Sequence, residues 1–169
     1  MAGTQPASLE YPPSMPLNPV DLYHIAWVVP DLESALNDFA STGLRWATPV
    51  TRHVATKTTR SERRSWSIRV TYSIDDPMHV ELIEQCPGSP WEIEPQGIPH
   101  HAGWWSHDLH EDIARLENDG YLLDAWMVDD NDQPSRFAYL VGPSGLRVEL
   151  VDVAAKPQLK AWWSGGQYP

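Results

Sequence analysis

One sequence pattern occurs twice in this chain and constrains the fold more than any other feature. The copies read HIAWVVPDL from His24 and HAGWWSHDL from His101: histidine, two small or apolar residues, tryptophan, three residues, then Asp-Leu. Seven positions separate the histidine from the aspartate in both copies, His24 to Asp31 and His101 to Asp108. A repeat of this kind predicts a duplicated module, with a histidine at the same place in each copy.

The residues around each copy predict a strand followed by a helix. Apolar runs with β-branched or aromatic residues precede each aspartate, which is typical of buried strands. Asp31 and Asp108 are good helix N-cap residues, and apolar residues follow both at helical spacing. Twelve positions after its cap, each helix meets a glycine, Gly43 or Gly120, the residue that most often ends a helix.

Three further strands are expected after each helix, and the two sets end in similar sequences. We expect them near 44–54, 65–74 and 78–84 in the first half, and near 122–128, 136–140 and 147–151 in the second. The last strands read HVELIE and RVELVD, so each holds a glutamate between Val and Leu, Glu81 and Glu149. The order predicts an α+β fold made of two βαβββ modules.

Proline and glycine mark the expected boundaries of the modules. Five prolines in residues 1–20 block regular structure, so this segment is expected to be an extended or disordered arm. A second proline- and glycine-rich stretch separates the two halves. The predicted divisions are the arm at 1–20, the first module at 21–86, a linker at 87–99, the second module at 100–153 and a C-terminal tail at 154–169.

Composition excludes several classes of partner. A formal net charge of −11 argues against general binding to nucleic acid or to an anionic membrane. The N-terminus has no basic segment followed by an apolar run, and no apolar stretch approaches membrane-spanning length. Cys86 is the only cysteine, which rules out an intramolecular disulfide and fits a reducing compartment. These features predict a soluble cytoplasmic protein.

Four polar residues stand at matched places in otherwise apolar strands: His24, Glu81, His101 and Glu149. An ionised carboxylate in a buried strand needs a cation or hydrogen-bond donors, because burying it alone is very costly. Two imidazoles and two carboxylates suit Zn²⁺, Ni²⁺, Co²⁺, Fe²⁺, Mn²⁺ or Mg²⁺, so we predict one divalent metal ion of open identity. Neighbouring residues alternate across a strand, so we expect His101 to face the metal and His100 to support it or point outward.

With these motifs the chain resembles the vicinal-oxygen-chelate superfamily of glyoxalases, bleomycin-resistance proteins and extradiol dioxygenases, over residues 22–152. The resemblance implies two βαβββ modules forming curved mixed sheets around a metal-binding cleft. His24 and His101 match the family's first-strand histidines, and Glu81 and Glu149 its last-strand acidic or amide ligands. The ligand set is similar to bacterial glyoxalase I, whereas motifs such as HIAWVVPDLESAL and RFAYLVGPSGLRVELVD are closer to the methylmalonyl-CoA epimerase-like branch.

The donor set and the resemblance together imply proton abstraction next to a metal-bound carbonyl. The metal would stabilise an enediolate-like intermediate, and Glu149 or Glu81 would act as the base. We therefore expect a metal-dependent isomerase or epimerase, or a related lyase, acting on a small carbonyl-containing molecule. A homodimer is compatible with the resemblance, because members of the superfamily often share modules or pack sheet edges between chains.

Two other functions fit the same resemblance. A metal-free drug-binding protein of the bleomycin-resistance type would suit an acidic chain, but such proteins normally lack the four ligands. An Fe(II) extradiol dioxygenase would use two histidines and one carboxylate, so a fourth ligand at Glu81 argues against it.

The tryptophans and the basic residues bear on the substrate. Trp27 and Trp104 follow the histidines by three positions and are expected on the opposite strand face, packed against helices. Other tryptophans are expected in the cleft or at a subunit contact, which would favour a large apolar substrate: Trp66, Trp105, Trp162 and Trp163. Residues 45–69 hold seven of the twelve Lys and Arg. They predict either a solvated face or a site for an anionic part of the substrate.

Overall fold

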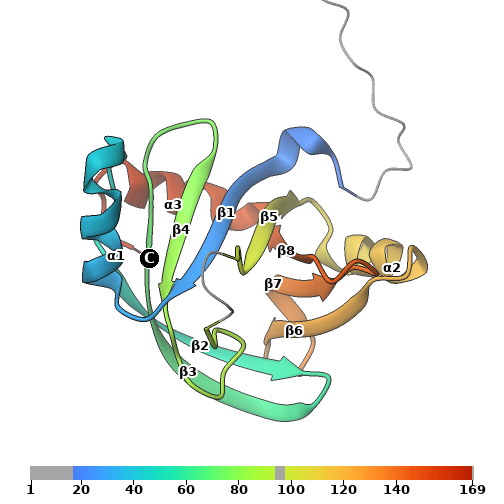
Figure 1. The fold of residues 1–169 in the computed structure, drawn as a ribbon. Helices are drawn as coiled ribbons and strands as arrows, with labels where there is room; N and C mark the ends of the chain where they lie inside the picture. Colours follow the sequence, from blue (N-terminus) through green and yellow to red (C-terminus); the bar gives the residue numbers. More distant parts are fainter. Residues whose placement is uncertain (1–16, 94–97, 169) are drawn as a thin grey trace, which may run out of the picture.

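The computed structural model describes residues 17–93 and 98–168 (Figure 1). Most of the expected arm at 1–20 and part of the expected linker at 87–99 lie outside the described residues. Within the arm, only the last residues are described, and Pro19–Asp21 forms a short 3-10 helix, η1.

Eight strands form one closed barrel in the order β1-β4-β3-β2-β6-β7-β8-β5. The bounds are β1 Leu22–Val29, β2 Val50–Thr58, β3 Ser61–Tyr72, β4 His79–Glu84, β5 His101–Ser106, β6 Leu122–Val128, β7 Pro134–Val141 and β8 Arg147–Asp152. Each half of the chain contributes four neighbouring strands. In each half the first and last strands pair in parallel and the other pairs are antiparallel. The predicted α+β class with curved mixed sheets is therefore confirmed.

The two halves join along two antiparallel seams, β1 with β5 and β2 with β6. At the first seam the two repeats of the histidine pattern become neighbours, with His24 opposite Gly103 and Ala26 opposite His101. A closed barrel leaves no free sheet edge, and its interior is filled by side chains that alternate along each strand. The seam therefore directs both repeated histidines into the same interior.

Two helices pack outside the barrel, and Figure 1 shows them on opposite sides of it. Helix α1, Leu32–Phe39, begins where the Asp31 side chain accepts a hydrogen bond from Ser34 N, and a short 3-10 helix, η2 at Ala40–Thr42, continues it to Gly43. Helix α2, Leu109–Asn118, is capped in the same way by Asp108.

Each helix packs on the outer face of its own half, as the tryptophan spacing predicts. Trp27 packs with Leu32 of α1, and Trp104 packs with the cluster that contains Leu109 of α2. The longest helix among the described residues is α2, with ten residues, about half of what a membrane span requires.

The basic stretch differs from its expected form. The strands expected near 44–54 and 65–74 leave residues 55–64 as their connection. In the structure β2 and β3 extend through this region, with only Thr59 and Arg60 between them. Val54 and Thr56 of β2 are buried, whereas Arg63 and Arg64 of β3 are exposed. The charged residues therefore belong to a long hairpin with a solvated part, and their density does not interrupt the strands.

The C-terminal segment, expected as a tail, forms a helix. It contains a short 3-10 helix, η3 at Val153–Ala155, and α3 at Lys156–Trp163. Leu159, Trp162 and Trp163 of α3 are buried with the residues of the barrel interior. Pro157 lies in the first turn, where proline favours the start of a helix. The helix thereby seals part of the barrel with apolar side chains.

Candidate metal centre

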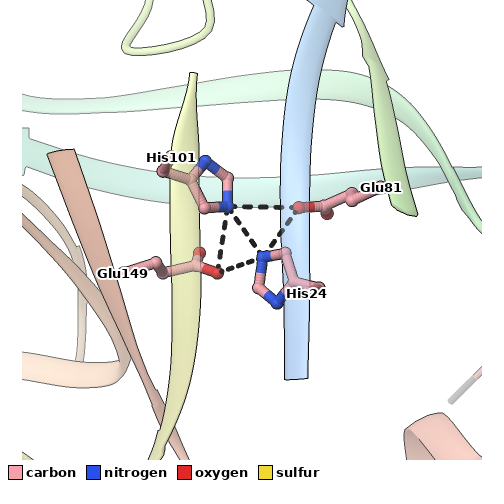
Figure 2. Close-up of side chains that lie close together, drawn as sticks. All are labelled: His24, Glu81, His101 and Glu149. Carbon is pink, nitrogen blue, oxygen red and sulfur yellow. Dashed lines mark hydrogen bonds and ion pairs between the residues drawn. The ribbon is translucent and has the colours of Figure 1, made fainter. Parts of the chain in front are cut away.

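Four side chains from four strands converge inside the barrel: His24 of β1, Glu81 of β4, His101 of β5 and Glu149 of β8 (Figure 2). They are between 0% and 6% exposed. The two Nε2 atoms of the histidines lie 2.8 Å apart. Oε2 of each glutamate lies 3.2 or 3.3 Å from both of these nitrogens. The residues predicted as one set from the sequence are thus brought together by the fold.

Strand register explains why the four meet. Ala26 pairs with His101 across the seam and with the glutamate of its own half on β4. Gly103 pairs with His24 across the seam and with the glutamate of its own half on β8. Ala26 therefore lies between His101 and Glu81, and Gly103 lies between His24 and Glu149. In each half, a small residue separates the glutamate of that half from the histidine of the other. This arrangement repeats the same half-site twice.

The histidines and glutamates hold each other in their charged forms. Burial alone would lower the pKa of His24, but Glu149 and Glu81 raise it to about 9. Burial alone would raise the pKa of Glu149, but His101 and His24 lower it to about 2. The same two histidines lower the pKa of Glu81 well below its usual range against the effect of burial. Two buried carboxylates require nearby positive charge, which imidazole protons or one divalent cation can supply.

The spacing of the donor atoms fits a divalent metal ion. At metal–ligand distances of about 2.1 Å, adjacent ligands lie about 3.0 Å apart in an octahedron and about 3.4 Å apart in a tetrahedron. The five distances given above lie between 2.8 and 3.3 Å. Oε2 of Glu81 is buried and accepts no hydrogen bond from the described residues. The chemistry and geometry of the set therefore fit such an ion without selecting among the candidate metals.

The sequence left open whether His100 supports His101 or points outward, and in the structure it contacts His101. It is buried, with Nδ1 2.8 Å from Nδ1 of His101 and Nε2 2.8 Å from the carbonyl oxygen of Pro90. A carbonyl only accepts hydrogen bonds, so this contact places the proton of His100 on Nε2. His100 Nδ1 then accepts from Nδ1–H of His101, and Nε2 of His101 is left to face the centre.

Arg147 acts on the same ring from the other side. Its Nη1 lies 2.5 Å from Nε2 of His100, and its Nη2 donates to Asp124 at 2.9 Å. Burial, with the charges of His101 and Arg147, lowers the pKa of His100 to about 3, so the ring is neutral. The guanidinium of Arg147 can only donate a hydrogen bond, so its contact with Nε2 of His100 would favour the tautomer that carries the proton on Nδ1. For His101 to bind a metal ion through Nε2, its Nδ1 must carry the proton, and this requires the tautomer of His100 that the Pro90 contact favours.

Two tyrosines at the centre were not anticipated from the sequence. Tyr72 of β3 pairs with Glu81, and Tyr139 of β7 pairs with Glu149, so each glutamate has a phenol on the adjacent strand. Burial and the charges of both glutamates raise the pKa of each tyrosine well above 10.0, which keeps the phenols protonated. The signal in the sequence is a tyrosine nine or ten positions before each glutamate.

A cavity gives access to the centre at Glu149. It is open to solvent on one side. Its walls are formed by tyrosines, one phenylalanine, two arginines and short apolar side chains. None of the tryptophans expected in the cleft borders it. Trp105, Trp162 and Trp163 belong instead to the apolar core, with Trp66 packed against them.

The other histidines of the sequence are not members of the donor set. His79 is buried, bonds to the carbonyl oxygen of Ser73 at 2.7 Å and stacks on Trp163 at 4.0 Å. His107 and His110 at the start of α2 are exposed. The second group of acids with suitable spacing, Asp31, Glu33 and Glu84, is mostly exposed and is engaged by Arg69 through the two glutamates.

Residues 23–139 match the sequence model of one family, described as the Glyoxalase/Bleomycin resistance protein/Dioxygenase superfamily. No curated protein matches the chain by sequence. Three solved structures are among those to which the chain is similar. Methylmalonyl-CoA epimerase from Mycobacterium tuberculosis is 18% identical, covering 78% of this chain and 87% of that one, with a TM-score of 0.47.

The other two are more distant. Trypanothione-dependent glyoxalase I from Leishmania major is 14% identical, covering 83% of this chain and 94% of that one, with a TM-score of 0.30. Lactoylglutathione lyase from Agrobacterium tumefaciens is 16% identical, covering 79% and 94%, with a TM-score of 0.29. At these identities and TM-scores, the solved structures inform neither the substrate nor the reaction.

Proposed function

This chain belongs to the glyoxalase/bleomycin resistance protein/dioxygenase superfamily, and on that premise we propose that it is a divalent-metal-dependent isomerase or epimerase, or a related lyase. The proposed reaction removes and returns a proton on a carbon next to a carbonyl group. The observation that carries the proposal is the buried set of His24, Glu81, His101 and Glu149, which opens onto a cavity at one member. In this proposal all four are metal ligands.

A divalent ion held by these four residues would supply Lewis-acid activation of the substrate carbonyl. Glu149 is proposed as the base, because it is the member of the set that also borders the cavity. The lowered pKa keeps the Glu149 carboxylate ionised at neutral pH but also makes it a weak base, so the proposed role rests on its position at the cavity. Glu81 is 3% exposed and does not border that cavity, and it is proposed to serve mainly as a ligand.

The surrounding side chains favour such chemistry by excluding water. Tyr23, Tyr72 and Phe137 border the cavity next to Glu149 and are at most 5% exposed. In surroundings of this kind electrostatic interactions are stronger than in water. A proton taken up by Glu149 could be returned to the same carbon or to its neighbour, and the part of the cavity that is open to solvent lets it exchange with D₂O before its return.

Metal analysis followed by hydrogen exchange tests the proposal. We expect about one divalent ion per chain, and deuterium uptake from D₂O at the α-carbon of a substrate drawn from a panel of hydroxy-ketones and acyl thioesters. Chelation should stop the uptake, and Glu149→Gln should abolish it. Glu62→Gln, at an exposed residue of β3, is the matched control and should behave as the unchanged protein.

Two results would contradict the proposal and favour an alternative. A protein without stoichiometric metal, whose ligand binding is unaffected by Glu149→Gln, would be a metal-free binding protein. Iron-dependent oxygen uptake with catechols would instead indicate a dioxygenase.

A further inference from the structure

Most arginines of the chain form an ion pair with a carboxylate. Two of the arginines without such a pair border the same cavity. Five of the nine form ion pairs: Arg45 with Asp75, Arg63 with Asp132, Arg69 with Glu33 and Glu84, Arg115 with Glu111, and Arg147 with Asp124. Within the described part of the chain, Arg52 and Arg136 have no carboxylate partner, and both border the cavity at Glu149. Arg60 and Arg64, also without one, are exposed on the β2–β3 hairpin.

Arg52 is directed inward by the alternation of β2. It lies two positions before Val54 and four before Thr56, both of which are buried, so the three share one strand face. The guanidinium is partly buried and lies 5.3 Å from the centre of the Tyr168 ring. Burial alone would lower the pKa of Arg52, but Tyr168, Tyr72, Glu81 and Glu149 together raise it. Among the described residues no carboxylate lies within ion-pair distance of Arg52, so an anion in the adjacent space would be its direct partner.

Two further groups make the cavity receptive to an anion. Arg136, at the start of β7, has a φ of 58°, which is a strained conformation for a side chain of this size. Tyr23 borders the same space, and its hydroxyl is buried with no hydrogen-bond partner among the described residues. These donors border the same space as Glu149, whose charge alone would repel an anion.

We propose that the cavity binds the carboxylate of a small organic acid, with Arg52 as its principal partner, Tyr23 as a second donor and Arg136 at the rim. The planar guanidinium of arginine matches a carboxylate in a bidentate pair. The aromatic side chains that border the cavity suit an apolar body next to the carboxylate. The inference rests on the proposed function for the reacting carbon, which would lie at Glu149, and it makes the substrate a carbonyl-containing carboxylate.

Ligand binding can be measured apart from catalysis. Acetate, benzoate and phenylacetate would each be compared with the corresponding amide, by calorimetric titration of the protein as purified and after treatment with chelator. We expect at least one acid to bind saturably, and about 10- to 100-fold more tightly than its amide, because a charge-assisted pair is lost with the amide. The preference should persist after chelation, which separates binding at Arg52 from binding to a metal ion.

Substitutions identify the residue responsible. Arg52→Gln should weaken binding of the acid to the level of the amide, whereas Arg52→Lys should retain part of the preference because it keeps the charge. Arg64→Gln, on the neighbouring strand and exposed, is the matched control and should bind as the unchanged protein does. Circular dichroism and thermal melting of Arg52→Lys and Arg52→Gln establish that both variants are folded.

Each contrary outcome is distinct from failure of the proposed function. Equal affinity for acids and amides, no saturable binding of any acid, or unchanged binding by folded Arg52→Gln would overturn the carboxylate site. Preferential binding of acids through Arg52, in a protein that shows no metal-dependent deuterium uptake, would support the site and contradict the proposed reaction.

Discussion

Gly103 of β5 lies so close to His24 of β1 that a Cβ atom on residue 103 would be 1.8 Å from Cε1 of the imidazole. The ring of His24 therefore occupies the space that any other side chain at position 103 would fill. Ala26, the residue at the matching place in the first half, does carry a Cβ atom and is fully buried. The repeated half-sites are thus packed differently, and the one that holds His24 depends on glycine.

Gly103→Ala should displace the His24 imidazole and weaken metal binding by about tenfold or more, while unfolding becomes easier by about 1–3 kcal/mol as in other overpacked cores. Competition titration with a chromogenic chelator measures the affinity, and thermal melting measures the stability. Ala102→Ser, the neighbouring residue on the other strand face, is the control. Equal metal affinity in Gly103→Ala and the unchanged protein would refute the role assigned to this contact.

His100→Ala should lower metal affinity by about 10- to 100-fold, the usual effect of removing a group that orients a ligand. The reason is that His101 loses the acceptor that keeps its proton on Nδ1. His100→Gln, which offers an acceptor at a similar distance, should recover part of the loss. His107→Ala, at an exposed histidine, is expected to bind metal normally. If His100→Ala matched that control, the orienting role would be wrong.

Metal binding should release at least one proton at neutral pH. His24 has a pKa of about 9 because of its two glutamates, so it is protonated at pH 7 and must lose that proton to become a ligand. Apparent affinity should therefore rise by about tenfold per pH unit, for each proton released, until the pH approaches 9. Calorimetric titration in buffers of different ionisation enthalpy counts the protons, and a count of zero would contradict the charge state assigned to the histidines.

The stability of chelator-treated protein should decrease as the pH rises from about 6.5 to 9. A group whose pKa is raised on folding stabilises the folded state below its unfolded pKa, and this stabilisation disappears as the pH passes the folded pKa. For His24, raised from 6.5 to about 9, the loss is roughly 3 kcal/mol. The glutamates have the opposite pH dependence. Because their pKa values are lowered on folding, the stability that they contribute is lost only as the pH falls below about 4.5.

Denaturant unfolding at several pH values checks this expectation. His24→Gln, which removes the ionisable ring, should flatten the decrease between pH 6.5 and 9. His110→Gln, at an exposed histidine, should leave the decrease unchanged. A decrease of equal size in both variants would show that His24 does not cause it.

The repeated pattern accounts for how much could be predicted from the sequence. Matched positions in two copies of a strand-helix unit meet when the copies pair along one seam, so His24 and His101 could be grouped before any geometry was known. Both helix starts followed from their capping aspartates. These predictions depend on local chemistry and on an internal comparison that the chain itself provides.

Residues without a recognised counterpart in the other half were harder to predict. Helix α3 is held by contacts of Trp162 and Trp163 with distant strands, which no local pattern reveals. Arg52 lies in a stretch rich in charge, where a solvated face is the ordinary explanation. Its inward direction follows from strand alternation only when the strand is known to continue through Thr58.

Because each half of the barrel provides one histidine and one glutamate, neither half alone can offer more than two donors. A metal ion bound at the first seam would join the N-terminal and C-terminal halves as a cross-link does, and its loss would weaken their association before it weakened either half. By the same count, a single module alone would have needed a second copy of itself to complete the site.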